Sequence, residues 1–74
     1  GEQGIRVNCV IPGNIKTPRQ SRWYSAEQEA QIVAEQKLKV RLEPHHVAAM
    51  VVFLASDAAS GCTAHNHWVD AGWL

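Results

Sequence analysis

Apolar and polar stretches alternate along the chain in an order that predicts strand, helix, helix, strand. The first apolar stretch, Ile5 to Ile11, is rich in β-branched residues, is too short for a globular helix and ends at Pro12-Gly13, so it predicts a strand. Apolar residues occur on both of its faces, as expected for a strand in a parallel sheet covered on both sides. The segment from His65 to Asp70 predicts a final short strand.

The first predicted helix follows a segment that has no sustained periodicity. Residues 14–24 mix basic, proline and aromatic residues, which predicts a loop or a loosely ordered flap. Ser25 and Gln28 then have the spacing of a capping box, and good helix formers continue to about Lys39. Glu35 and Lys39 have the spacing of an i,i+4 ion pair within this helix.

The second predicted helix runs from Pro44 to about Ser56. Proline is tolerated in the first helical turn, and Glu43 places negative charge at the positive end of the helix dipole. Residues 47–55 are apolar on every helical face, a pattern typical of helices that are buried on most sides. A strand-helix-strand connection makes the two strands parallel, and a parallel sheet needs both faces covered. We therefore expect an α/β segment of a larger sheet.

Length and composition limit the chain to one small core. It has 74 residues, of which 46% are hydrophobic and 19% charged, and its formal net charge is zero. This composition excludes a disordered tail and a basic nucleic-acid-binding protein. The apolar run 47–55 is much shorter than the roughly 20 residues that cross a bilayer, so no membrane partner is expected. The sequence begins with Gly1 and not with an initiating methionine, which indicates a fragment.

The cysteines and histidines raise the question of disulfides and metals. Cys9 and Cys62 are too few for a disulfide framework, so we interpret both as reduced thiols of a cytoplasmic protein. Cys62, His65 and His67 could offer a thiolate and two imidazoles, but their spacing is not that of a structural zinc site. Surface or interface histidines are the favoured interpretation, and no metal is expected.

Five motifs, in this order and spacing, resemble the C-terminal third of the short-chain dehydrogenase/reductase family. They are Gly-Ile-Arg-Val-Asn-Cys-Val-Ile-Pro-Gly (4–13), Ile15-Lys16-Thr17-Pro18, Arg41-Leu42-Glu43-Pro44 with Val47-Ala48, Phe53-Leu54-Ala55-Ser56-Asp57-Ala58-Ala59-Ser60, and Val69-Asp70-Ala71-Gly72. Each motif alone is weak, but together they cover nearly the whole chain. In its details the chain most resembles the bacterial sugar 1-dehydrogenases of this family.

The resemblance implies a C-terminal fragment of a Rossmann-type, doubly wound parallel sheet. Residues 1–74 would be one segment of a single dinucleotide-binding domain. Within it, residues 14–40 would form the substrate flap, residues 44–56 a buried helix used in subunit pairing, and residues 65–70 the edge strand. The implied partners are the remainder of the parent chain and other subunits of a homo-oligomer.

The resemblance also implies a binding site for NAD or NADP where the first strand ends. Its cofactor-binding residues would be Pro12, Gly13, Ile15 and Thr17. The backbone of Ile15 would meet the nicotinamide carboxamide, and the Thr17 hydroxyl would bond the carboxamide or a phosphate. The chemistry is suitable, because a backbone N–H and carbonyl can recognise an amide and a hydroxyl can donate to either group.

The implied substrate-binding residues are Asn14 and Trp23. An aromatic ring such as that of Trp23 could stack on a sugar or could seat the flap on the core, and both interpretations remain open. Trp68, Trp73 and Leu74 are predicted to be buried packing residues near a subunit contact. Ala64 and Ala71 stand where the family usually has glycine, which leaves the path of the last turn open.

The implied activity is the NAD(P)-dependent oxidation of the anomeric carbon of an aldose. The chain has no glycine-rich dinucleotide-binding turn and no Tyr-x-x-x-Lys pair, since its only tyrosine, Tyr24, has Gln28 four residues on. It would therefore carry one wall of the active site and no catalytic residue. A second hypothesis is a non-catalytic assembly module that associates through segments 44–56 and 65–70. The sequence upstream of Gly1 distinguishes the two.

Overall fold

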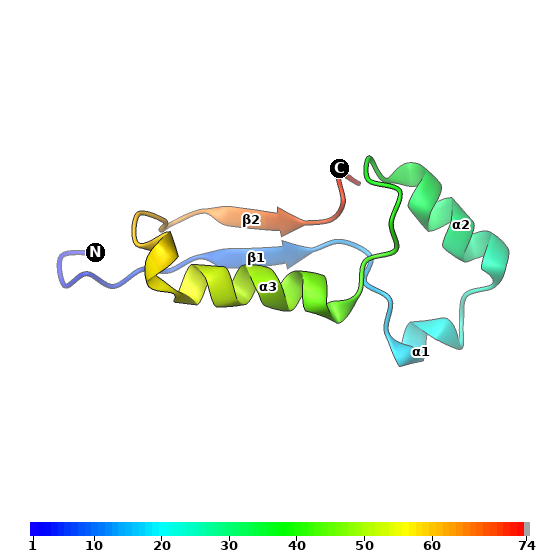
Figure 1. Cartoon of the computed structure of the whole chain (residues 1–74), viewed down its shortest axis with the longest axis horizontal. Coiled ribbons are helices and arrows are strands. Elements are labelled where there is room, and N and C mark those ends of the chain that lie inside the picture. The colour runs from blue at the N-terminus through cyan, green and yellow to red at the C-terminus, as the bar shows by residue number, and fades with distance from the viewer. Residues whose placement is uncertain (74) are drawn as a thin grey trace.

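The fold consists of a small parallel sheet with one helix packed on it, and a segment with two short helices beyond one end of the sheet (Figure 1). The computed structural model describes residues 1–20 and 22–73 in full and residue 21 by its backbone alone. Strands β1 (Cys9–Pro12) and β2 (Asn66–Val69) pair in parallel, with Cys9 opposite Asn66 and Pro12 opposite Val69. The predicted α/β class and the parallel pairing are confirmed.

Helix α3 (Pro44–Ala55) lies along the sheet and contacts both strands, and the short 3₁₀ helix η1 (Asp57–Ala59) follows it. Helix α3 begins at Pro44, as the sequence predicts. Helices α1 (Pro18–Ser21) and α2 (Ala26–Glu35) lie beyond the carboxyl ends of the strands (Figure 1). In the described residues no helix has both the length and the apolar character needed to cross a bilayer.

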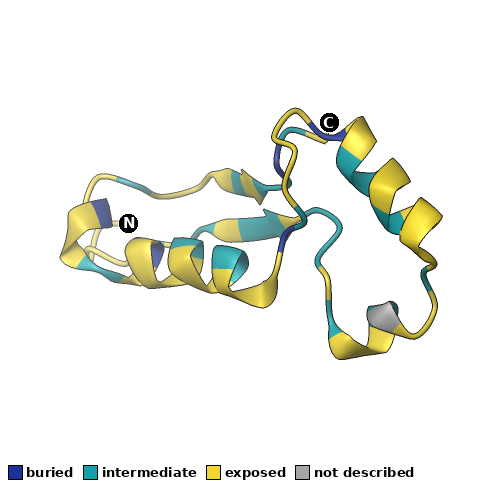
Figure 2. Cartoon of the chain, turned by 45° about the vertical axis from the view of Figure 1, so that its right-hand side comes forward, coloured by how far each residue is buried: buried dark blue, intermediate teal, exposed yellow. Residues whose placement is uncertain are grey.

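The core of this chain is very small, as the burial colouring in Figure 2 shows. Among the described residues, the buried apolar ones are Leu42, Leu54, Ala59 and Ala71. The radius of gyration is 15.0 Å, whereas a compact domain of this length has about 11 Å. The accessible surface is 5520 Å², against about 4500 Å² for a folded monomer of this mass. The chain alone therefore leaves excess surface uncovered.

Several large apolar residues are more exposed than their pattern predicts. Helix α3 was expected to be buried on most sides, but in this chain it buries only Leu54, while Val52 remains 68% exposed. Trp68 and Trp73, expected to be buried, are 51% and 49% exposed, and Leu74 lies outside the described residues. One helix on two strands has too little surface to cover these side chains.

Helix α2 has the predicted beginning but ends earlier than predicted. Both hydrogen bonds of the capping box between Ser25 and Gln28 are present. The helix ends at Glu35 because Gln36 adopts an extended conformation and its buried side chain donates to the carbonyls of Leu38 and Val40. The predicted pair of Glu35 with Lys39 does not form, since Lys39 Nζ donates to the carbonyl of Ala34, 2.9 Å away.

The ends of the strands also differ from the prediction. Pairing of β1 begins at Cys9 rather than Ile5. Before it, side chains add to the backbone contacts. The Ala64 N–H donates to the carbonyl of Val7 at 2.7 Å, the Val7 N–H donates to Thr63 Oγ1 at 3.1 Å, and Asn8 Nδ2 donates to the carbonyl of Cys62 at 2.9 Å. The two alanines in glycine-like positions, Ala64 and Ala71, have left-handed backbones, with φ of 61° and 54°. The last turn therefore keeps a glycine-like path.

Candidate functional site

The candidate site begins where β1 ends, and its first feature is a close approach of two chain segments. The N–H of Gly13 donates to the carbonyl of Val69 at 2.9 Å. A Cβ at position 13 would lie 2.7 Å from the Cβ of Asp70, which is closer than carbon atoms pack. Only glycine fits here, and the reason is space rather than a positive φ. The carboxyl ends of the two strands are thereby held together, with Pro12 as the last residue of β1.

Ile15 lies just beyond this point, in an isolated parallel bridge with Leu42. The hydrogen bond at the bridge runs from the N–H of Lys16 to the carbonyl of Leu42, at 2.8 Å. The N–H and the carbonyl of Ile15 itself make no hydrogen bond within the described residues. Ile15 therefore presents one free donor and one free acceptor at the carboxyl end of the strands.

Arg41 holds the residue before Ile15 from two directions. Its Nη1 donates to the carbonyl of Asn14 at 2.6 Å, and its Nη2 donates to Asn14 Oδ1 at 3.0 Å. Nη2 also donates to Gln20 Oε1 at 3.0 Å, and Nε pairs with Glu29 Oε2 on α2. One guanidinium thus connects the end of β1, α1 and α2.

The other sequence-predicted residues are placed differently. Thr17 is the N-cap of α1, and its Oγ1 accepts from the N–H of Gln20 at 3.2 Å. With Lys16, Pro18 and residues 43–45 it lines an open hollow. Trp23 is 74% exposed, so little of it is covered by the described part of the chain. The structure therefore gathers Gly13, Asn14, Ile15 and Thr17 at the end of β1 and leaves the Trp23 side chain in solvent.

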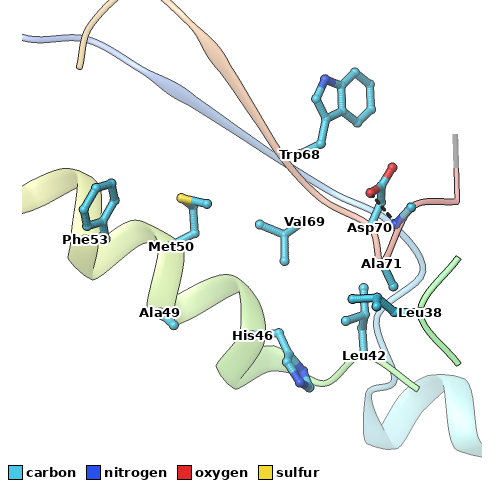
Figure 3. A pocket seen from close by; sticks show the side chains of 11 residues that line it. Leu38, Leu42, His46, Ala49, Met50, Phe53, Trp68, Val69, Asp70 and Ala71 are labelled. Atoms are coloured by element: carbon cyan, nitrogen blue, oxygen red, sulfur yellow. Dashed lines mark hydrogen bonds between the residues drawn. The ribbon is translucent and has the colours of Figure 1, made fainter. Parts of the chain in front are cut away.

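A separate apolar groove of about 570 Å³ lies between α3, the end of β2 and the segment before α3 (Figure 3). Its wall on α3 includes Met50 and Phe53, and its opposite wall includes Trp68 and Val69. The one carboxylate in its lining, Asp70, accepts from the N–H of Gly72 at 3.0 Å and so stabilises the last turn. The groove contains none of the sequence-predicted site residues.

The cysteine and histidine side chains form separate local contacts. Cys9 and Cys62 are both free thiols. His65 Nδ1 lies 2.6 Å from the carbonyl of Thr63, and His67 Nε2 lies 3.2 Å from Asn8 Oδ1. Across residues 1–73, no group of three or more histidine, cysteine or acidic side chains is arranged to hold a metal ion.

Sequence reasoning missed the part that Arg41 plays at this site. The residue is visible in the Arg41-Leu42-Glu43-Pro44 motif, but nothing in the motif indicates which residues the guanidinium contacts. Asn14 lies 27 positions away in the sequence, and only the folded chain brings it within reach of Arg41. The one signal that the sequence offers is the position of this arginine, three residues before the proline that begins α3.

In open α/β sheets, ligands bind outside the carboxyl ends of parallel strands, which is where the free polar groups of this chain lie. A family model described as enoyl-(acyl carrier protein) reductase matches residues 1–74. The chain belongs to this family of short-chain dehydrogenases/reductases, as its motifs indicate.

Known proteins resemble the chain in sequence and in structure. It is 63% identical to D-xylose 1-dehydrogenase of Caulobacter vibrioides over 99% of this chain and 29% of that protein. It is 38% identical to a probable galactose dehydrogenase of Rhizobium meliloti over 97% of this chain and 28% of that protein. A 4-hydroxyisoleucine dehydrogenase mutant complexed with NADH and succinate matches with a TM-score of 0.86 and 30% identity, over 99% of this chain and 30% of that structure. The chain therefore spans less than one third of these relatives.

Proposed function

We propose that the chain forms one wall of the active site of a longer NAD(P)-dependent sugar 1-dehydrogenase. The observation that carries this proposal is the free N–H and carbonyl of Ile15 at the carboxyl end of β1. In open α/β sheets, ligands bind outside the carboxyl ends of the strands. The 63% identity to D-xylose 1-dehydrogenase supports the choice of an aldose as substrate.

The groups present at this edge fit a nicotinamide carboxamide. A carboxamide has an NH₂ donor and a carbonyl acceptor, which match the free carbonyl and N–H of Ile15. A hydroxyl can hydrogen-bond a carboxamide or a phosphate, and we assign that contact to Thr17, whose Oγ1 accepts from the N–H of Gln20. Pro12 and Gly13 complete this wall, since the close contact of Gly13 with Asp70 fixes where the chain leaves β1. The relative solved with NADH supports a nicotinamide cofactor.

The bound nicotinamide supplies the hydride acceptor for the reaction. The anomeric C–H of the aldose gives up a hydride and the anomeric hydroxyl gives up a proton, so that a lactone forms. This chain positions the reactants, and the group that accepts the proton comes from outside it. Asn14 keeps its Nδ2 donor free for a sugar hydroxyl while Oδ1 is held by Arg41. Trp23, exposed on the flap 14–40, supplies a ring face for the sugar.

The remaining proposals concern the partners of the chain. Residues 1–74 form one segment of a single dinucleotide-binding domain, and the rest of the parent chain covers part of the exposed helix 44–56. Other subunits of a homo-oligomer cover the remainder together with the edge strand 65–70. The exposure of Val51, Val52 and Phe53 supports both contacts.

The two free thiols support a cytoplasmic protein.

The test is turnover by the full-length protein that contains this segment. The purified protein is incubated with NAD⁺ or NADP⁺ and a panel of aldoses including D-xylose, and reduced nicotinamide is followed by absorbance. We expect aldose-dependent reduction with a lactone as the product, trapped as a hydroxamate. A folded protein that binds no nicotinamide cofactor, or that binds it and oxidises alcohols but no aldose, would overturn the proposal.

A further inference from the structure

We propose that Arg41 is a positioning residue that aims the backbone of Ile15 at the nicotinamide carboxamide. This inference rests on the proposed function, because it assigns a role within the same site. The inference goes beyond the proposed function, because it names the residue that orients the free backbone groups of Ile15. Arg41 itself touches neither cofactor nor substrate in this scheme; it acts through the peptide that it holds.

The first step is the geometry of one peptide unit. The carbonyl of Asn14 and the N–H of Ile15 belong to the same planar, trans peptide, so they point in opposite directions. Arg41 Nη1 holds that carbonyl at 2.6 Å, and Nη2 holds the Asn14 side chain at 3.0 Å. Two contacts from one rigid fork fix the rotation of this peptide, which therefore directs the Ile15 N–H away from Arg41.

The next peptide is held by the neighbouring residue. The N–H of Lys16 donates to the carbonyl of Leu42 at 2.8 Å, and the carbonyl of Ile15 shares that peptide plane. The Ile15 carbonyl therefore also points away from the 41–42 segment. Residues 41 and 42 together fix both peptide planes around Ile15, and both free groups face the opposite side.

The guanidinium is itself anchored. Its side chain is 13% exposed, and Nε pairs with Glu29 on α2, whose side chain is 23% exposed. Nη2 also donates to Gln20 Oε1 at 3.0 Å on α1. Because donors on all three nitrogens are engaged, the fork cannot rotate without breaking contacts to the flap. A lysine ammonium in its place is a point donor and cannot hold the carbonyl and the side chain of Asn14 in one plane.

The experiment compares three ligands in the full-length protein. They are the natural cofactor, its 3-acetylpyridine analogue, in which a methyl ketone replaces the amide, and the matching adenosine diphosphoribose, which has no nicotinamide. We expect the Kd of the natural cofactor to rise about tenfold in Arg41→Met. The variant loses one to two charge-assisted hydrogen bonds to Asn14, and only part of that lost free energy reaches the cofactor. The Kd of the diphosphoribose should stay within about twofold, and the preference for the amide over the ketone should fall.

The matched control is Arg6→Met. Arg6 is another half-buried arginine, with Nη1 2.8 Å from the carbonyl of Leu54 and Nη2 3.3 Å from that of Ser56, but it lies before the amino end of β1. This variant makes the same chemical change and loses hydrogen bonds from a guanidinium to backbone carbonyls. We expect it to lower the melting temperature while the preference between amide and ketone stays that of the unmodified protein.

The outcomes separate this inference from the proposed function. An unmodified protein that binds no nicotinamide cofactor overturns the proposed function. An unmodified protein that binds it, together with an Arg41→Met variant of unchanged amide preference, overturns the role of Arg41 alone. If Arg41→Met does not fold, as judged by lost diphosphoribose binding, Arg41→Lys decides. A loss of amide preference of about threefold supports positioning by the fork, and an unchanged preference overturns it.

Discussion

Gly13 and Asp70 approach so closely that a Cβ on residue 13 would lie 2.7 Å from the Cβ and 2.8 Å from the Cα of Asp70. The contact joins the segments that leave β1 and β2 at the same edge of the sheet. Because one of the two neighbouring atoms is backbone, the clash cannot be relieved by rotating a side chain. The position of the candidate site therefore depends on the absence of a side chain at residue 13.

Gly13→Ala should destabilise the full-length protein by about 1 to 3 kcal/mol, the usual effect of overpacking. The measurement is denaturant unfolding of both proteins. The matched control is Gly61→Ala, since a Cβ at position 61 meets nothing within 4 Å and its φ is not positive. Equal stability of Gly13→Ala and the unmodified protein would show that the two segments can separate at no cost.

The left-handed backbone of Ala64 predicts a substitution that increases stability, whereas Gly13→Ala decreases it. A left-handed conformation costs a residue with a Cβ about 1 kcal/mol, and glycine avoids this strain. Ala64 is exposed, so Ala64→Gly loses little buried area and should stabilise the protein by about 0.5 to 1 kcal/mol. Ala71 is buried, so the lost methyl burial there offsets the relief of strain.

The control for Ala64→Gly is Ala48→Gly, the same change at an exposed position inside α3. Because glycine disfavours helical interiors, this variant should destabilise the protein by about 1 kcal/mol. Thermal unfolding of the two variants side by side measures both the expected gain and the expected loss of stability. A lower melting temperature for Ala64→Gly would mean that the left-handed turn is not strained.

The elements that local chemistry determines were predictable from the sequence. Ser25 and Gln28 predict the start of α2, and Pro44 predicts the start of α3. Thr17-Pro18 contains an equally local signal, an N-cap before proline, yet α1 falls in a segment predicted to be a loop. Its four residues are too short to show a periodic pattern.

Features that depend on distant contacts were not predictable in this way. The end of α2 depends on the Gln36 amide bonding Leu38 and Val40, which no helix propensity encodes. At the candidate site, the sequence shows Gly13 as the end of a strand, but only the folded chain shows that glycine is needed for the space beside Asp70. The contact between Arg41 and Asn14 joins residues far apart in sequence, so only the folded structure reveals it.

Glu35 gives a prediction about pH. The hydrogen bond from Gln31, first, and that from the Trp73 indole, second, hold the pKa of the Glu35 carboxyl below its usual value of 4.5. Because the folded-state pKa is lowered, these bonds stabilise the fold above the ordinary pKa, and their contribution disappears as the pH falls through the lowered value. The indole N–H resonance of Trp73 should therefore titrate with a midpoint below 4.5.

Two variants test the order of these causes. Gln31→Leu should raise the pKa of Glu35 more than Trp73→Phe does, because the Gln31 bond contributes more to lowering it. Carboxyl carbon shifts of Glu35, followed by NMR against pH, report the midpoint in each variant. Identical midpoints in both variants and the unmodified protein would exclude these bonds in solution.

Trp23→Ala should raise the KM for the aldose in the full-length enzyme while leaving the KM for the cofactor nearly unchanged. The reason is that Trp23 is 74% exposed on the flap, so the substitution removes little buried surface from this chain. Loss of one stacking surface corresponds to a rise of about threefold to tenfold. Steady-state kinetics with each reactant varied in turn separates the two constants. A large drop in melting temperature with an unaltered sugar KM would assign Trp23 to packing.

The last prediction concerns the 74-residue chain by itself. Its accessible surface exceeds that of a compact monomer of this mass by about 1000 Å². If half of that excess is apolar, covering it is worth roughly 12 kcal/mol, as much as the whole stability of a small domain, about 5 to 15 kcal/mol. We therefore expect the isolated chain to be unfolded at low concentration and ordered only when α3 and β2 are covered by association.

Sedimentation velocity and thermal melting over a range of concentrations test this expectation. The melting temperature should rise with protein concentration, because association stabilises only the folded form. Val52→Lys, on the exposed part of α3, should suppress association, whereas Gln31→Lys, on the exposed part of α2, should not. A monomer that melts cooperatively at micromolar concentration, with a midpoint independent of concentration, would show that the small core around Leu42 and Leu54 is sufficient for folding.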